Sequence, residues 1–141
     1  MNIAQARKNS IDNQIRPWGG LDYIANNALK SVPREEFVPD HYKNLAFADI
    51  EIPLSNKAKM LSPKVEGRLL DALNIQKNET VLEVGTGSGY LTAVLSKLSQ
   101  SVTSIEIDET LSQDAQERLK TLNISNVTLE IGDASRGWQR S

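Results

Sequence analysis

A run of glycines and small polar residues carries the clearest chemical signal in this 141-residue sequence. The run comprises Gly85, Thr86, Gly87, Ser88 and Gly89. It follows a nearly continuous apolar stretch over residues 80–84, which predicts a buried parallel strand, and a helix is expected directly after it. Glycines let a backbone approach a ligand closely, and the first turn of a helix offers free N–H groups. The run therefore predicts a nucleotide-type cofactor site, and its glycines alone do not decide which cofactor binds.

Three acidic residues are placed at the ends of three successive predicted strands. Glu83 precedes the first glycine by two residues, where a carboxylate suits the sulfonium and amino group of S-adenosylmethionine and would repel a pyrophosphate. Glu106 ends the second strand, where a carboxylate can accept both ribose hydroxyls, a feature shared with NAD-binding proteins. Asp133 follows the third strand and is placed to meet the adenine edge. Each acid by itself is explained as a strand-end or turn residue, but the three together favour a sulfonium nucleoside.

The spacing of the glycines argues against a dinucleotide enzyme. Gly89 comes two residues after Gly87, and Tyr90 occupies the place that the dinucleotide fingerprint reserves for its third glycine. A nucleotide-dependent oxidoreductase is therefore an alternative that both this spacing and Glu83 disfavour.

The elements expected around the glycine run predict a Rossmann-like α/β fold with a parallel sheet and right-handed crossovers. Strands are expected over residues 80–84, 102–107 and 127–131, and helices over 63–73, 90–98 and 109–122. Upstream, helices are expected over 2–15 and 22–30, one helical turn over 34–38, and a loop over 42–61 with a short extended piece around Ile50 and Ile52. The expected division is an N-terminal helical extension on the substrate side over 1–62 and a cofactor-binding part over 63–141.

Composition narrows the class of protein. The sequence has 16 basic and 18 acidic residues and a net charge of −2, so no basic surplus indicates a nucleic-acid partner. It has no cysteine, which excludes disulfides and thiolate zinc sites, and no metal site is identified. No apolar run approaches the roughly 20 residues that span a bilayer, and the N-terminus lacks the apolar core of a signal peptide. A cytoplasmic protein without a membrane partner is expected.

Several further residues are interpreted as structural. His41 is expected at the surface, and Trp18 and Trp138 are expected to pack or to lie at interfaces. Arg34 is expected to form a structural ion pair beside its neighbours Glu35 and Glu36.

With these residues in view, the sequence resembles the protein-L-isoaspartate O-methyltransferase family over about residues 8–138. Residues 81–93 are similar to its first motif, 104–106 to its second-strand motif, and 126–133 with 137–138 to its third. The N-terminal stretches 32–39 and 46–49 are more specific to this family, and 14–18 resembles a proteobacterial branch of it.

The resemblance implies methylation of the α-carboxylate of isoaspartyl residues in damaged proteins, with S-adenosylmethionine as donor. The partner implied is thus a protein or peptide that carries a carboxylate. In the family the ester collapses to a succinimide, whose hydrolysis returns some normal aspartate. A carboxylate is already a nucleophile, so the enzyme must mainly align it with the methyl group, and no acid–base catalytic residue is identified.

The segment before Pro63 departs from the family pattern. Lys59 stands where the family usually has a threonine and Leu61 where it has a serine, while Ser62 is expected only to cap a helix. The departure keeps two alternatives open: a methyltransferase of this fold with another acceptor, and a non-catalytic cofactor-binding module. One hypothesis is that Lys57 or Lys59 supplies a cation for a different carboxylate substrate; solvated loop lysines are the simpler interpretation.

Three strands are fewer than the sheet of this family has. Val81, Leu82 and Val84 are therefore expected to keep an open edge, and the chain to be a fragment or to be covered by a second chain. Self-association through this edge is a further expectation.

Overall fold

The computed structural model describes residues 2–15, 23–55 and 57–138. The N-terminal region holds α1 (Ile3–Asn9), the π-helical η1 (Ser10–Ile15), α3 (Tyr23–Ser31), the 3₁₀ helices η2 (Arg34–Phe37) and η3 (Asp40–Leu45), and the strands β1 (Ile52–Pro53) and β2 (Lys59–Met60). The remainder holds α4 (Pro63–Leu73), β3 (Thr80–Val84), α5 (Tyr90–Leu98), β4 (Ser101–Glu106), α6 (Glu109–Thr121) and β5 (Val127–Ile131). Trp18, Asp22 and most of the 14–18 motif lie outside the described residues.

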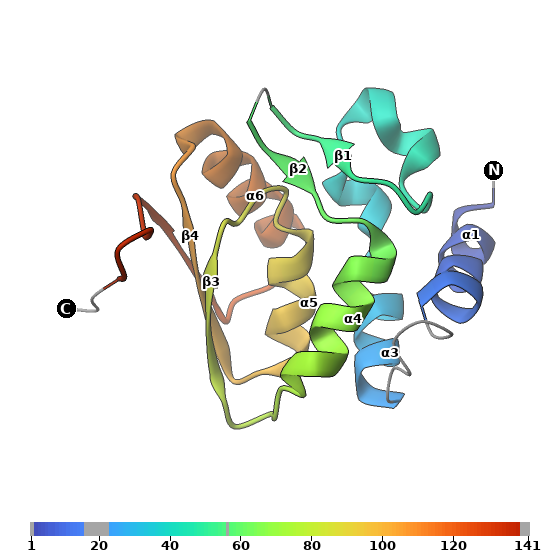
Figure 1. Ribbon diagram of the computed structural model, residues 1–141, viewed down its shortest axis with the longest axis horizontal. Coiled ribbons are helices and arrows are strands. Elements are labelled where there is room, and N and C mark those ends of the chain that lie inside the picture. The colour runs from blue at the N-terminus through green and yellow to red at the C-terminus, as the bar shows by residue number, and fades with distance from the viewer. Residues whose placement is uncertain (1, 16–22, 56, 139–141) are drawn as a thin grey trace.

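The sheet of the C-terminal part is parallel and has the strand order β3-β4-β5. The helices α4, α5 and α6 lie on one side of it (Figure 1). The core between these layers includes the fully buried Ala93 and Val94 of α5 and Val102 of β4, and Val81 of β3 packs against it. Because the strands pair in parallel, their carboxyl ends meet at one edge of the sheet. The three predicted strands and the alternating helices are confirmed.

The opposite face of β3 is not buried, so the prediction of a buried strand is wrong for this face, while the expectation that Leu82 and Val84 stay uncovered is confirmed. Leu82 and Val84 are 53% and 61% exposed, because side chains alternate between the faces of a strand and no helix covers this face in the described part of the chain. Trp138 folds back on this side of the sheet: its ring lies against Gly132, and its indole N–H donates to the Glu130 carboxylate. Trp138 thus packs, as expected.

The N-terminal region is more structured than its sequence indicates. In the expected loop over 42–61, η3 occupies the beginning, and β1 and β2 form an antiparallel hairpin in which Ile52 pairs with Met60. Ile52 and Met60 are both buried, so the hairpin is anchored on the core. Two-residue strands leave too short an alternation to be seen in a sequence.

Helix α4 begins at Pro63 as predicted, but its cap is different. Ser62 occupies the N-cap position and makes no side-chain cap hydrogen bond. The Lys64 N–H donates instead to Oδ1 of Asp49 at 3.1 Å, so a residue 15 positions upstream satisfies the first turn of the helix.

No helix in the described ranges is long and apolar enough to cross a membrane. His41 is exposed and its ring lies against that of Tyr42, with 4.3 Å between the ring centroids.

Candidate functional site

The glycine run forms a tight turn between β3 and α5. Gly85, Gly87 and Gly89 have φ angles of +95°, +58° and +90°, a region that L side chains rarely adopt. A Cβ at Gly89 would also come within 3.0 Å of the Ala115 Cβ, so α6 packs directly on the loop. At Gly89, glycine is thus required both for the backbone conformation and for the close approach of a neighbouring helix.

The N–H groups of these glycines already have partners inside the protein. Gly85 donates to the Ile105 carbonyl at 2.7 Å, and Gly89 donates to the Thr86 carbonyl at 3.0 Å. Gly87 donates to Oε1 of Glu106 at 2.8 Å. The free N–H groups that the sequence predicts belong to the first turn of α5, whereas these three glycine N–H groups stabilise the turn itself. These three N–H groups are therefore not available to a pyrophosphate, which needs several free donors.

The hydroxyl groups of the loop are also used internally. Thr86 and Ser88 are both buried. The Thr86 hydroxyl lies 2.6 Å from the Ser104 hydroxyl, and the Ser88 hydroxyl accepts from the Tyr90 N–H at 3.2 Å. These side chains therefore stabilise the shape of the loop.

Glu106 connects the loop to the start of α6. Its Oε1 accepts from the Gly87 N–H, and its Oε2 accepts from the Asp108 N–H at 2.9 Å. A carboxylate has about four acceptor sites, so each oxygen retains capacity for a further donor. Glu106 is 6% exposed, and its orientation is fixed by both backbone contacts before any ligand binds.

Glu83 points into a polar network beneath the loop. Its Oε1 accepts from the Ser104 hydroxyl at 2.6 Å and from the Thr92 hydroxyl. Burial raises the pKa of Glu83 to about 7, although the hydrogen bonds from Ser104 and Thr92 oppose this, and the nearby Glu106 raises the pKa further. Near neutral pH, Glu83 is therefore poised between its protonated and ionised forms, and a cation beside it would favour the ionised form.

Asp133 follows β5 at the same edge of the sheet. The Gly132 N–H donates to the Glu106 carbonyl at 3.0 Å, which ties this turn to the end of β4. Asp133 is exposed, and its Oδ1 accepts from the Ser135 N–H at 2.9 Å, a contact that lowers its pKa. It does not line the cavity at the loop described below, so its contact with adenine stays a prediction.

A cavity of about 70 Å³ lies between the loop on one side and β2 and α4 on the other. Residues 85–88 and Glu83 form one wall, and Lys59, Leu61 and Glu66 lie among the residues of the other. Small-molecule sites are typically roughly 300–1,000 Å³, so this space would enclose one end of a nucleoside ligand. The structure thus brings Glu83 and the glycine loop together with two further charged residues, Lys59 of β2 and Glu66 of α4.

Glu66 is a site residue that the sequence analysis missed. It is 3% exposed and forms an ion pair with Arg34, which is equally buried. Burial raises the pKa of Glu66 to about 7, which the Arg34 charge opposes, and the Glu83 charge adds to the rise. The helical period of the sequence could have indicated that Glu66 is buried, because it places Glu66 on the same face of α4 as Pro63 and Leu70.

Arg34 joins several segments around this cavity. Its Nε donates to the Ala46 carbonyl at 2.7 Å and its Nη2 to the Leu61 carbonyl at 3.1 Å, and its guanidinium lies 4.8 Å from the centroid of the Tyr90 ring. The expected pairing of Arg34 with Glu35 or Glu36 is wrong. Glu36 is exposed, and Glu35 pairs with Arg7, because the 3₁₀ turn directs these side chains to different neighbours.

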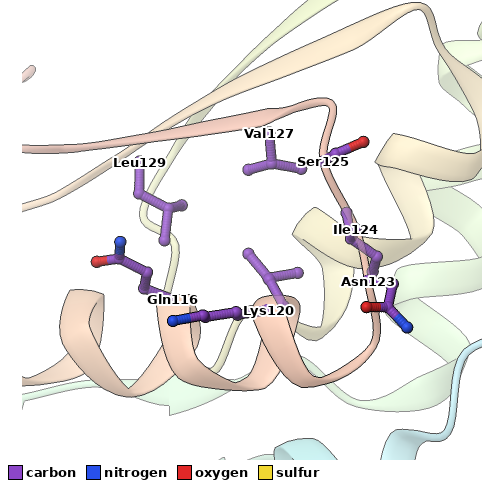
Figure 2. A pocket seen from close by; sticks show the side chains of 8 residues that line it. Gln116, Lys120, Asn123, Ile124, Ser125, Val127 and Leu129 are labelled. Atoms are coloured by element: carbon purple, nitrogen blue, oxygen red, sulfur yellow. The ribbon is translucent and has the colours of Figure 1, made fainter.

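A larger cleft, of about 440 Å³, lies away from the loop between α6 and β5 (Figure 2). Leu119, Val127 and Leu129 form much of its wall, and Lys120 is the ionisable residue among those that line it. It lies toward the start of β5, whereas the acids and glycines described above are at the carboxyl ends of strands. Volume alone therefore does not identify the site of chemistry.

Comparison with known proteins agrees with this geometry. The model of the family described as protein-L-isoaspartate(D-aspartate) O-methyltransferase matches residues 8–141. The chain belongs to this family. A curated protein-L-isoaspartate O-methyltransferase from Petrotoga mobilis is 34% identical over 140 residues, which are 99% of this chain and 66% of that protein. For other curated relatives the matched share is 56% or 51%, so the chain spans between about half and two thirds of their length.

Solved structures of the family have the same fold. One protein-L-isoaspartate O-methyltransferase superposes with a TM-score of 0.73 at 26% identity, covering 82% of this chain and 39% of that one. Another, from Plasmodium falciparum in complex with S-adenosyl-L-homocysteine, superposes with a TM-score of 0.72 at 21% identity, covering 96% of this chain and 64% of that one. The Rossmann-like α/β fold and the family resemblance predicted from the sequence are confirmed.

Proposed function

We propose that this chain carries the S-adenosylmethionine-binding part of an enzyme that methylates carboxylates of isoaspartyl residues in damaged proteins. The observation that carries the proposal is the cavity at the glycine loop, in which Glu83 and Glu66 line the same space in a member of this family. Glu66 is already paired with Arg34, but Glu83 is bound by the hydroxyls of Ser104 and Thr92, so its carboxylate favours a ligand with a positive charge and disfavours a pyrophosphate. The occupied loop amides support the same choice.

The proposed binding roles follow from the groups that remain available. Glu106 would accept hydrogen bonds from the ribose hydroxyls with the capacity left on its carboxylate. Glu83 would hold the positive end of the cofactor, while residues 85–89 would provide a surface that the ligand can approach closely. Asp133 would meet the adenine edge. The P. falciparum neighbour, which shares this fold, was solved in complex with S-adenosyl-L-homocysteine.

The reaction demands little acid–base chemistry from the chain. The bound cofactor supplies an electrophilic methyl group on a sulfonium. The carboxylate acceptor is already a nucleophile, so the residues of the chain need to bind, orient and exclude water rather than to move a proton. Because a cation and an anion become neutral products, a site with little water favours the transfer.

A binding and transfer experiment tests this function in the natural full-length protein. Titration with S-adenosyl-L-homocysteine by calorimetry should show binding that Glu106→Gln weakens and that Glu109→Gln, three residues along on α6, leaves unchanged. Methyl esters of carboxylates release methanol in base, so methanol formation from an isoaspartyl peptide measures turnover, with the aspartyl peptide as control. Binding of the ligand with no methanol above that control would reject the isoaspartyl function.

A second candidate is transfer to another acceptor, or cofactor binding without transfer. Lys59 at the cavity and the 38% exposed Leu61 favour it, because neither supplies the hydroxyl that the family usually has there. Ligand binding together with methylation of a different substrate, or of none, would support this candidate.

We also propose that two copies of this chain associate through the edge strand β3. Leu82 and Val84 form an exposed apolar strip on the edge strand β3, which could pair with a second copy. Sedimentation of residues 1–141 should show concentration-dependent dimers that Leu82→Lys removes. The cytoplasmic location stays a prediction, which cell fractionation would test.

A further inference from the structure

An anionic substrate meets an electrostatic barrier at the loop cavity. Glu66 and Glu83 both line it, and each becomes negatively charged as the pH rises through about 7. Arg34 is paired with Glu66, but its guanidinium is buried and also donates hydrogen bonds to two backbone carbonyls. A carboxylate that approaches from outside therefore gains little from Arg34.

Lys59 is the one cationic side chain among the described residues that line this cavity. It lies on β2 next to the buried Met60, so the alternation of the strand directs Lys59 away from the core. Its side chain is 63% exposed, and its Nζ makes a loose ion pair with Oε1 of Glu51 at 3.9 Å. The ammonium is thus accessible at the rim of the cavity and is not committed to a close partner.

The backbone that carries Lys59 is held in place relative to the loop. The strand pairs with β1, and the carbonyl of Leu61, two residues further on, accepts from Nη2 of the buried Arg34. Arg34 also contacts the ring of Tyr90, directly after the glycine loop. A cation on this strand therefore has a defined place beside the glycine loop rather than the freedom of a loop tip.

We infer that Lys59 is a specificity-determining residue that attracts and orients the carboxylate of the methyl acceptor at the rim of the loop cavity. The inference rests on the proposed carboxyl methylation, and it assigns the acceptor an anionic group that exchanges with Glu51 for the ammonium. Lys59 acts on acceptor binding and takes no part in the transfer itself, in which the acceptor oxygen gains the methyl group as the sulfur–carbon bond breaks.

Charge variants on this hairpin test the inference in the natural full-length protein. The measurements are KM and kcat for an isoaspartyl peptide by methanol release, and the Kd of S-adenosyl-L-homocysteine by calorimetry. Lys59→Ala should raise the acceptor KM about fivefold, the effect of losing an ion pair of roughly 1 kcal/mol, and should leave kcat and the Kd unchanged. Lys57→Ala is the matched control, because Lys57 is exposed on the same hairpin and does not line the cavity.

Two further variants separate charge from structure. Lys59→Arg should restore a KM near that of the wild type, and Glu51→Gln should lower it, because it removes the competing carboxylate. Added salt should raise the wild-type KM and have little effect on Lys59→Ala.

An unchanged KM and salt dependence in Lys59→Ala, with the wild type active, would overturn the role of Lys59 and leave the proposed function standing. A wild type that binds S-adenosyl-L-homocysteine but methylates no carboxylate peptide would overturn both.

Discussion

Replacing Glu83 by glutamine should remove most of the pH dependence of donor binding. Glutamine keeps the size of the side chain and its carbonyl acceptor for Ser104, but it cannot ionise. Burial raises the pKa of Glu83 to about 7, and the acids that face it, Glu106 and Glu66, oppose its ionisation further. The pKa is raised, so the ionised form that suits a cationic ligand is lost as the pH falls through about 7.

The size of the effect follows from the ionised fraction. With a pKa of about 7, roughly one tenth of Glu83 is ionised at pH ~6 and nine tenths at pH ~8, so the apparent Kd should be about tenfold weaker at the lower pH. The variant should bind more weakly at pH ~8, by about 1.5–3 kcal/mol for a hydrogen bond to a charged group.

Stability should change in the opposite sense. A folded-state pKa of about 7 against an ordinary 4.5 means that wild-type stability is fully present below about 4.5 and declines as the pH rises through about 7. The loss is at most about 3 kcal/mol, and Glu83→Gln should avoid it.

Calorimetric titration with S-adenosylmethionine, the cationic donor, over pH ~6–8 measures the first effect, and urea unfolding without ligand measures the second. Two buffers of different ionisation enthalpy would also count the protons released on binding. Glu117→Gln, an exposed acid on α6, is the control and should keep the wild-type profile. A pH-independent wild-type affinity, or a full tenfold dependence retained by Glu83→Gln, would refute the role given to this carboxylate.

Three stability predictions concern the frame of the site, and each is measured by chemical denaturation. Arg34→Met should cost about 3–5 kcal/mol because it leaves the buried Glu66 unpaired, and adding Glu66→Leu should recover much of the loss; an additive double variant would contradict this. Gly89→Ala should cost about 1–3 kcal/mol because of its φ of +90° and the contact with Ala115, and a neutral result would show that the loop can relax. Asp49→Ala should cost about 1 kcal/mol through the lost contact with the first turn of α4, whereas stability equal to wild type would mean that water replaces this cap.

The strands, the helices and the glycine loop between them could be predicted from the sequence because their signals are local. An apolar run, a 3.6-residue period and glycines at short spacing each act over a few neighbouring residues. These patterns were sufficient for the parallel sheet, for the cofactor loop and for the carboxylates of Glu83 and Glu106 at the carboxyl ends of their strands. The specific N-terminal stretches were likewise sufficient for the family.

Which residues form the wall of the cavity opposite the glycine loop depends on the tertiary structure. Arg34 and Glu66 are 32 residues apart, and neither periodicity nor composition indicates that they form a buried pair. The cap of α4 from Asp49 is similar, since the hydroxyl of Ser62, next to the helix, makes no cap hydrogen bond in the folded chain.

The role proposed for Lys59 likewise depends on both the sequence and the tertiary structure. Its sequence position marks it as different from the family, but only the pairing of β1 with β2 places it at the cavity that Glu83 also lines. Local patterns determine which elements form because their energies depend on neighbouring residues. The charges that share one cavity depend on long-range packing, and that information is present only in the folded chain.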